Sequence, residues 1–300
     1  MGRLVLNIFF ILFLSAPVKA EIVTVYDDFG NSLSFDQPVK KIIVLSPHLT
    51  ELVFEAGAQE KLVATVEFAD YPPAAGQIPR IGSYNTWDVE KIVAMKPDIV
   101  LVWLSARGIE MLERLKQLGL RVYVSEPRKL SDISRTIRDI GIMSGSNDIA
   151  EKRAKEFERA IASLKGKYKN RKRVRLFYQV WRPPLVTING KQLINQVFNL
   201  CGGENIFADL PALAPVISIE SLLLENPDVI LGGARQEDRQ RWLHEWRKWP
   251  ALNAVKNNNL FFVNPDLLSR QTSRMLQGAY QVCDQLEQVR QKSVKNDRRQ

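Results

Sequence analysis

Two stretches of the chain repeat the same succession of polar and apolar positions. In each, a glutamate (Glu90 or Glu220) opens a short amphipathic segment, and a Pro-Asp pair follows it before an apolar run. This pattern predicts a short helix that ends at the proline and leads into a buried strand. A helix–strand unit that recurs after 130 positions predicts two lobes of similar build.

Strand and helix patterns alternate in both halves of the chain, which predicts an α/β fold with a parallel sheet in each lobe. The first lobe opens with two short strands within Val23–Phe35. Its sheet strands are expected at Lys40–Ser46, Leu62–Phe68, Asp98–Trp103 and Arg121–Val124, with one helix capped by Thr50 and closed by Gly57 and another near Gly108–Leu118. In the second lobe we expect strands at Arg173–Trp181, Val229–Leu231 and Leu260–Val263, helices near Gln192–Leu200 and Arg239–Trp249, and a closing helix through Cys283.

Two strongly helical segments, Ser131–Ile142 and Asp148–Lys169, separate the lobes. At about 1.5 Å per residue the second reaches about 30 Å, roughly the diameter of a lobe, so we expect only small hinge motion. The predicted division is a signal peptide at 1–20, a first lobe at 21–125, connecting helices at 126–170 with a backbone helix at 148–169, a second lobe at 171–291 and a frayed basic tail at 292–300.

The first residues have the pattern of a secretory signal. Arg3 supplies a positive start, Leu4–Leu14 is apolar, and Val18-Lys19-Ala20 fits a small-residue cleavage site. The apolar run is shorter than the roughly 20 residues that a membrane-spanning helix needs, and no cysteine follows the cut to carry a lipid. We therefore expect a periplasmic chain that begins at Glu21.

The two cysteines, Cys201 and Cys283, would then lie in an oxidising compartment. They either pair, which would stabilise the fold by about 4–5 kcal/mol in the chain-entropy model, or remain two buried thiols. No C-x-x-C motif occurs, and the only histidines are His48 and His244, so no metal site is expected.

The net charge of +9 does not indicate nucleic-acid binding. Most of it comes from the signal, from a basic run over 165–175 and from the tail, and without these the rest of the chain is slightly acidic. The basic run contains no acid and is typical of a solvated helix end. A nucleic-acid partner is therefore not expected.

Aromatic and apolar residues gather at the predicted strand ends, where ligands of parallel sheets bind. They are His48, Phe68, Tyr71, Tyr84 and Trp103 in the first lobe, and Trp181 and Leu185 in the second, with Asp266 and Arg270 after the last strand. Such a lining suits a bulky, largely uncharged planar ligand. The alternative is that these side chains only fill the interface between the lobes.

The chain lacks the nucleophile elbow, dinucleotide, phosphate-loop and zinc-protease motifs, so we do not expect an enzyme. Glu90 and Glu220 would each be favoured by a helix dipole, by about 0.3–1 kcal/mol, which explains either one alone. Their equivalence in two lobes further suggests docking onto a two-fold partner that carries arginines.

These segments resemble the periplasmic cobalamin (vitamin B12) binding proteins of ABC-type uptake systems. The resemblance runs from Lys40 to Leu286 and rests on Leu45-Ser46-Pro47, Thr50-Glu51-Leu52, Asp70-Tyr71-Pro72-Pro73, Glu90–Asp98, Asn195-Gln196-Val197 and Cys201–Phe207. The Pro-Asp segments also occur in siderophore- and haem-binding relatives, whereas the segment at Cys201 is closer to the cobalamin branch.

The resemblance implies two Rossmann-like lobes joined by one backbone helix, in a monomer that binds cobalamin as cargo, without a cofactor, and delivers it to the permease dimer of an inner-membrane ABC transporter. It places a disulfide at Cys201 and Cys283 and the docking residues at Glu90 and Glu220. It places the ligand-binding positions at Phe68, Tyr84, Trp103, Leu185, Asp266, Leu267, Leu268, Ser269 and Arg270.

The chain departs from the family pattern. Phe68 and Tyr84 stand where a tyrosine and a tryptophan are expected, and Leu185 and Ala214 stand where aromatic residues are expected. These departures put the affinity and the preferred corrinoid in doubt. The rival functions are haem or ferric-siderophore binding on the same fold, a periplasmic hydrolase using His48, and a structural interaction protein without a small-molecule ligand.

Overall fold

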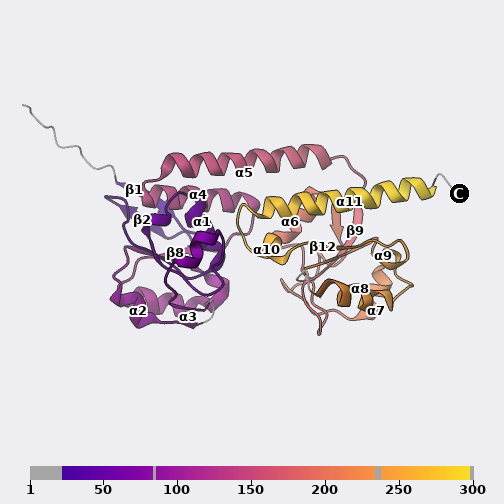
Figure 1. Ribbon diagram of the computed structural model, residues 1–300, viewed down its shortest axis with the longest axis horizontal. Coiled ribbons are helices and arrows are strands. Elements are labelled where there is room, and N and C mark those ends of the chain that lie inside the picture. Colours follow the sequence, from indigo (N-terminus) through magenta and orange to yellow (C-terminus); the bar gives the residue numbers. More distant parts are fainter. Residues whose placement is uncertain (1–21, 84–85, 234–237, 298–300) are drawn as a thin grey trace, which may run out of the picture.

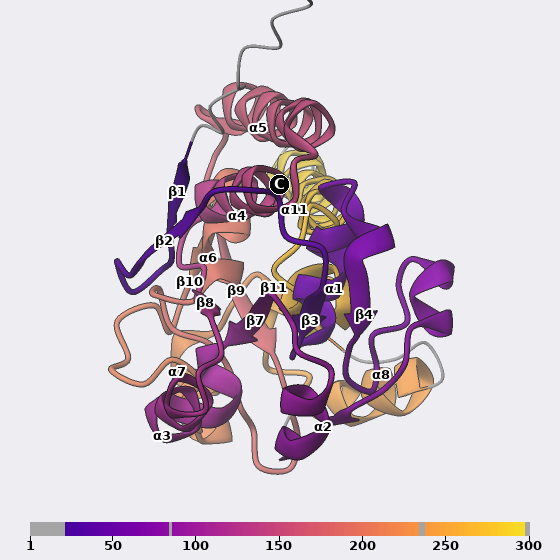
Figure 2. The ribbon, with the colours of Figure 1, turned by 90° about the vertical axis from the view of Figure 1, so that its left-hand side faces the viewer.

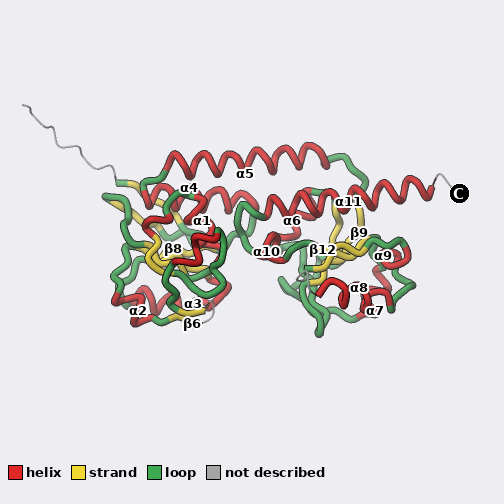
Figure 3. Tube along the Cα trace, viewed as in Figure 1, coloured by secondary structure: helices red, strands yellow, loops and turns green. Residues whose placement is uncertain are grey.

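The computed structural model describes residues 22–83, 86–233 and 238–297, and in it two α/β lobes lie next to each other on one side of a layer of long helices (Figure 1). Each lobe contains a four-stranded parallel sheet (Figure 3). This architecture confirms the predicted fold class. The predicted signal peptide and Tyr84 lie outside the described residues.

The sheet of the first lobe has the strand order β4-β3-β7-β8. Its strands are β3 (Ile42–Val44), β4 (Leu62–Ala64), β7 (Ile99–Trp103) and β8 (Val122–Ser125). The lobe also contains two small antiparallel pairs, β1 (Val23–Tyr26) with β2 (Ser32–Phe35) and β5 (Gly82–Ser83) with β6 (Thr86–Trp87). Phe68, expected at the end of β4, lies beyond this strand with a positive φ of 62°.

The sheet of the second lobe has the order β10-β9-β11-β12. Its strands are β9 (Val174–Gln179), β10 (Gly203–Asn205), β11 (Val229–Gly232) and β12 (Leu260–Phe262). Counted along the chain, both sheets have the order second, first, third, fourth. The two lobes therefore share one topology, as the repeat predicts, although the short β10 was not expected in a segment that begins with glycines.

The Pro-Asp pair of the repeat has the same structural role in both lobes. Asp98 accepts hydrogen bonds from the backbone N–H groups of Lys40 and Lys41, at 2.6 and 2.9 Å. Asp228 accepts one from the backbone N–H of Arg175, at 3.2 Å. Burial alone would raise the pKa of Asp98, but the two N–H groups hold it below its usual range. In each lobe the carboxylate joins the start of the third strand to the start of the first.

The helices of the first lobe are α1 (Pro47–Glu55), α2 (Val89–Ala94) and α3 (Leu104–Gln117), with short 3-10 helices at η1 (Gln59–Lys61) and η2 (Pro73–Gln77). Those of the second lobe are α6 (Leu193–Leu200), α7 (Ile219–Glu225), α8 (Arg239–Arg247), α9 (Asn253–Lys256) and α10 (Pro265–Ser269). The helices of the back layer are α4 (Leu130–Ser144), α5 (Asn147–Tyr168) and α11 (Met275–Asp297).

Two predictions about helix ends are wrong. Helix α1 is capped by Ser46 rather than Thr50, because proline at the first helical position starts the helix earlier and Ser46 Oγ accepts a hydrogen bond from the N–H of Leu49. Helix α11 continues to Asp297, through most of the segment expected to be frayed. Lys292 in that segment donates to the backbone oxygen of Asn258 at 3.1 Å, which attaches the helix to the second lobe.

Helix α5 spans both lobes, and α4 and α11 lie between it and the sheets (Figures 1 and 2). A single apolar cluster contains Leu52 and Leu176 of the two lobes together with Ile137, Phe157 and Val282 of the three back helices. The lobes are therefore joined through a shared core and not through a flexible linker.

The back layer is held together by close contact and by charge. A side chain added at Gly141 of α4 would place its Cβ 2.3 Å from the Cβ of Ala150 of α5, so only glycine permits this helix spacing. Arg138 of α4 pairs with Glu151 and Glu158 of α5, each at 2.5 Å. Of the helices in the described part of the chain, none is both long enough and apolar enough to cross a membrane.

The structure confirms the predicted disulfide. Cys201, at the end of α6, is bonded to Cys283 in α11, and their Cα atoms are 4.6 Å apart. The bond connects the second lobe to the closing helix across 82 positions of sequence.

Candidate functional site

The two lobes face each other across the carboxyl ends of their strands. In the second lobe the chain leaves β12 and reaches Arg270 through α10, and in the first lobe β3 leads into α1, which carries Glu51. Arg270 Nη1 lies 2.9 Å from Glu51 Oε1. Because ligands of open parallel sheets bind beyond the carboxyl ends of the strands, the space between the lobes at this edge is the candidate site, here called the cleft.

Glu51 is the centre of an ion network at this edge. Only 1% of its side chain is exposed, and it accepts hydrogen bonds from Arg270 and Arg274 at 2.9 and 3.1 Å. Arg270 also pairs with Asp70 of the first lobe at 2.7 Å and with Asp266 of its own lobe at 3.3 Å. Burial raises the pKa of Glu51 above its usual range, and both guanidinium groups oppose that rise. The network couples the two lobes.

His48 and Trp103 lie at neighbouring strand ends of the first lobe, with their ring centroids 5.3 Å apart in an edge-to-face arrangement. His48 is only 3% exposed, and its Nδ1 lies 3.3 Å from Ser46 Oγ. Burial, and secondly the positive charge of Arg270, lower the pKa of His48 to about 3. His48 is therefore a neutral packing group at pH 7, and it supports the half-buried Trp103.

The segment from Phe68 to Tyr71 forms the rim of the first lobe. Phe68 is 63% exposed, and the Tyr71 ring lies 3.9 Å from the guanidinium carbon of Arg274. Since Asp70 pairs with Arg270, this segment is attached to the second lobe while its phenylalanine stays free for contact. Tyr84, the other predicted aromatic position here, lies outside the described residues.

The predicted ligand-binding residues of the second lobe divide into exposed and buried ones. Ser269 is exposed, and Asp266 and Arg270 are partly exposed. Leu185, Leu267 and Leu268 are buried: Leu185 packs in the core of the second lobe and Leu268 in the core that both lobes share. Only Asp266, Ser269 and Arg270 are thus open to a ligand in this arrangement.

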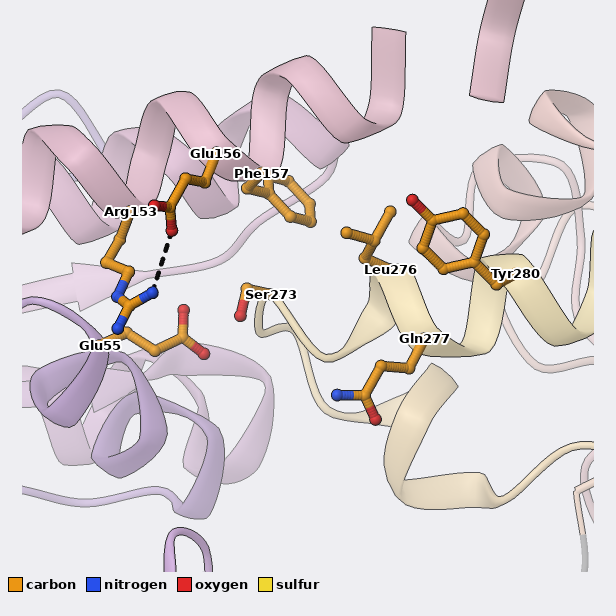
Figure 4. Close-up of a pocket in the computed structure, with 8 residues that line it drawn as sticks. All are labelled: Glu55, Arg153, Glu156, Phe157, Ser273, Leu276, Gln277 and Tyr280. Carbon is orange, nitrogen blue, oxygen red and sulfur yellow. Dashed lines mark hydrogen bonds and ion pairs between the residues drawn. The ribbon is translucent and has the colours of Figure 1, made fainter. Parts of the chain in front are cut away.

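A cavity of 240 Å³ lies where α1, α5 and the start of α11 meet (Figure 4). It is lined by Glu55, Arg153, Glu156, Phe157, Ser273, Leu276, Gln277 and Tyr280. Burial raises the pKa of Glu55 to about 7. The cavity is smaller than typical ligand pockets of about 300–1,000 Å³, so the cleft remains the candidate site for a bulky ligand.

No group of three or more histidine, cysteine or acidic side chains in the described part of the chain is arranged to hold a metal ion.

Glu90 and Glu220 occupy equivalent places on the outside of the two lobes. Both are exposed and lie in the first turn of their helices, which Asp88 and Ser218 cap through hydrogen bonds to backbone N–H groups at 2.9 and 3.1 Å. Helices α2 and α7 lie on the side of the molecule away from α5 (Figure 1). The two helices that carry these exposed glutamates therefore lie on one common side of the protein, one in each lobe.

Sequence reasoning did not identify Glu51 and Arg274 as site residues. The available signal was the position of Glu51 on the apolar face of a predicted helix, where a charge needs a buried partner. Its partners lie more than 200 positions away, so the sequence pattern alone did not reveal them.

The sequence profile of the periplasmic binding protein family matches residues 42–267. A relative named vitamin B12-binding protein from Vibrio parahaemolyticus is 35% identical over 265 residues, which are 88% of this chain and 96% of the relative. One of the same name from Vibrio cholerae is 36% identical over 250 residues, covering 83% of this chain and 90% of the relative.

The crystal structure of the periplasmic vitamin B12 binding protein BtuF of Vibrio cholerae has a TM-score of 0.79 and 35% identity to this chain, covering 84% of this chain and 98% of its own. The periplasmic heme-binding protein RhuT from Roseiflexus has a TM-score of 0.72 at 20% identity, covering 83% and 98%. The second similarity concerns the fold alone.

The buried, neutral His48 predicts an acid-dependent loss of stability. A depressed histidine pKa contributes stability that is complete above the unfolded pKa of about 6.5 and is lost as the pH falls toward about 3. When the pH falls from 7 to 5, protonation of this histidine in the unfolded state should therefore lower the free energy of unfolding by about 2 kcal/mol. Urea unfolding of wild type and His48→Gln at both pH values measures the difference. The exposed His244→Gln is the control and should behave as wild type; an equal acid loss in the His48 variant would contradict this account.

The Glu51 network predicts a second stability effect. Glu51→Gln should reduce the free energy of unfolding at pH 7 by about 2–3 kcal/mol, because two guanidinium groups then lose their buried partner. Asp70→Asn, which removes an exposed partner of the same Arg270, should cost less than about 1 kcal/mol. Urea unfolding compares the two variants. Equal losses would show that the buried carboxylate has no special role.

Proposed function

The chain belongs to the periplasmic binding protein family, and on that premise we propose that it captures cobalamin in the cleft and delivers it to an ABC transporter of the inner membrane. The observation that carries this proposal is the similarity, over nearly the whole length and in both lobes, to proteins named for binding vitamin B12. The action is binding without chemistry. The proposed location is the periplasm, after a leader is cleaved behind Ala20.

The cleft offers the two kinds of contact that a corrinoid requires. The corrin ring is broad and apolar on its faces, and Phe68 and Trp103 of the first lobe supply aromatic surface for one face. Amide side chains surround the ring, and Asp266, Ser269 and Arg270 of the second lobe supply donors and acceptors for them. Tyr84, Leu185, Leu267 and Leu268 remain predicted family positions. Because Leu185, Leu267 and Leu268 are buried, their side chains would have to move to touch a ligand, unless their backbone makes the contact.

Ligand capture requires Arg270 to exchange a partner. Glu51 is buried and shared with Arg274, so this pair is the fixed part of the network. Asp70 is the exposed partner of Arg270 and lies on the rim beside Phe68. An amide oxygen of the ligand could replace Asp70 at low cost, since a solvent-exposed ion pair contributes little.

Haem binding is the nearest rival, and two observations count against it. Haem iron usually needs a tyrosine or histidine ligand. His48 is almost completely buried, whereas Tyr71 is 39% exposed with one face of its ring against the Arg274 guanidinium. The similarity to heme-binding proteins is moreover limited to the fold. These observations favour the corrinoid.

We expect one molecule of cyanocobalamin to bind per chain. Calorimetric titration of the protein purified from the periplasm of an expression host should give a dissociation constant below about 1 μM, with haemin and a ferric siderophore as controls. Binding of a control ligand but not of cyanocobalamin would leave the fold assignment unchanged and would show that the protein captures a different ligand. Absence of binding to all three would reject a role in their capture.

The second prediction concerns delivery. Glu90 and Glu220 are proposed to dock onto arginines of the two permease subunits, so the double variant Glu90→Ala with Glu220→Ala should bind cyanocobalamin as wild type does but lose most cobalamin uptake. Uptake is measured with labelled cobalamin in cells that lack the native protein. Glu113→Ala with Glu204→Ala changes one exposed glutamate in each lobe, on α3 and β10 rather than on α2 and α7, and serves as the control. Normal uptake by the Glu90→Ala, Glu220→Ala variant would show that these two glutamates are not needed for docking.

A further inference from the structure

The second lobe carries an exposed apolar face at the carboxyl edge of its sheet. Beyond β9 the chain forms a small antiparallel arrangement in which Trp181 pairs with Val186 and Val186 pairs with Val216. Residues directly opposite each other on antiparallel strands point to the same side, so these three side chains share one face. Trp181 and Val216 are each 64% exposed, so this apolar face is open to solvent.

The opposite side of the same strand belongs to the core. Leu185 and Thr187, on either side of Val186, are buried, and Leu185 packs in the core of the second lobe. Alternation along the strand thus directs Val186 outward and its two neighbours inward. The outward face, and not Leu185, is the surface that this segment presents outside the core.

Trp181 is held rigidly although it is exposed. Its backbone N–H and oxygen both bond to Val186, at 3.5 and 3.0 Å, and its indole N–H donates to the backbone oxygen of Pro183 at 3.1 Å. The ring therefore has its polar group satisfied and little freedom to lose when a ligand packs on it. A preorganised, exposed aromatic ring with a satisfied N–H is typical of a binding surface.

The position of this face connects it to the cleft. The strands of the second sheet are parallel, and the carboxyl end of β12 leads to Arg270, which reaches the first lobe. Trp181 follows β9, and β9 lies two strands from β12, so the carboxyl ends of these two strands are about 10 Å apart along the same edge. On the first lobe, Phe68 is the most exposed of the described aromatic residues beyond β4. Each lobe thus presents exposed aromatic surface beyond the carboxyl edge of its sheet.

We propose that the face formed by Trp181, Val186 and Val216 is the second-lobe wall of the ligand site and that the Trp181 ring packs against the apolar part of the corrinoid. This inference rests on the proposed function and adds a specificity-determining residue to it. The family pattern expects aromatic residues at positions 185 and 214, where this chain has Leu185 and Ala214. In this chain the Trp181 indole supplies the aromatic contact instead.

The test is calorimetric titration of cyanocobalamin into wild type, Trp181→Ala and Trp181→Phe, with melting curves to verify folding. Trp181→Ala should weaken binding about tenfold, and Trp181→Phe, which keeps a ring, should stay within about threefold of wild type. Val216→Ser tests the same face from another strand and should weaken binding about threefold, even if the tryptophan variant folds poorly. Phe29→Ala, an exposed aromatic on the turn between β1 and β2, should have no effect.

The outcomes separate this inference from the function on which it rests. Tight binding by wild type with unchanged affinity in Trp181→Ala and Val216→Ser overturns the inference and leaves cobalamin capture intact. Unchanged affinity together with lost uptake by Trp181→Ala assigns the face to the transporter, which also overturns it. Failure of the wild type itself to bind cyanocobalamin rejects the proposed function and this contact with it.

Discussion

The apolar core that the two lobes share through α4, α5 and α11 is the constraint on which the rest of the structure depends. Because both sheets pack against the same helices, the cleft between their carboxyl ends has a defined width before any ligand arrives. Helices α2 and α7, on the side of the molecule away from α5, pack through Ile92 and Leu222 on separate cores, one in each lobe. The Glu51 network then sets the contact of the lobes at the cleft itself, with charges from both lobes in one buried cluster.

The shared topology explains why one short motif occurs twice. In each lobe the repeat helix precedes the third strand, and the aspartate after the proline holds the start of the neighbouring first strand. The primary role of the motif is thus to connect neighbouring strands of the sheet. Glu90 and Glu220 gain matching positions as a result, since each lies in the first turn of a helix whose place the sheet determines.

Local patterns predicted most of this fold. The back helix, the parallel strands and the repeat all follow from hydrophobic periodicity and from proline and glycine positions, which act over a few residues. The disulfide followed from the compartment and the family resemblance. Sequence reasoning failed where long-range packing decides: Ser46 instead of Thr50 caps α1, and Lys292 attaches a segment expected to fray. The burial of Leu185 beside the outward Val186 was also not predicted, while a ligand-binding role of Leu185 stays a prediction. A register difference of one residue reverses the direction of a side chain in a strand, and no local pattern determined it here.

The partners of Glu51 have a consequence for how the protein is made. The carboxylate lies near the start of the chain, and the two arginines that compensate it lie 219 and 223 positions later. While those arginines are still unsynthesised, a folded first lobe has no counter-charge for this carboxylate. The contact between the lobes at this point therefore forms only once the segment that precedes α11 has been made. The last part of the chain to be synthesised thus completes an interaction of the first.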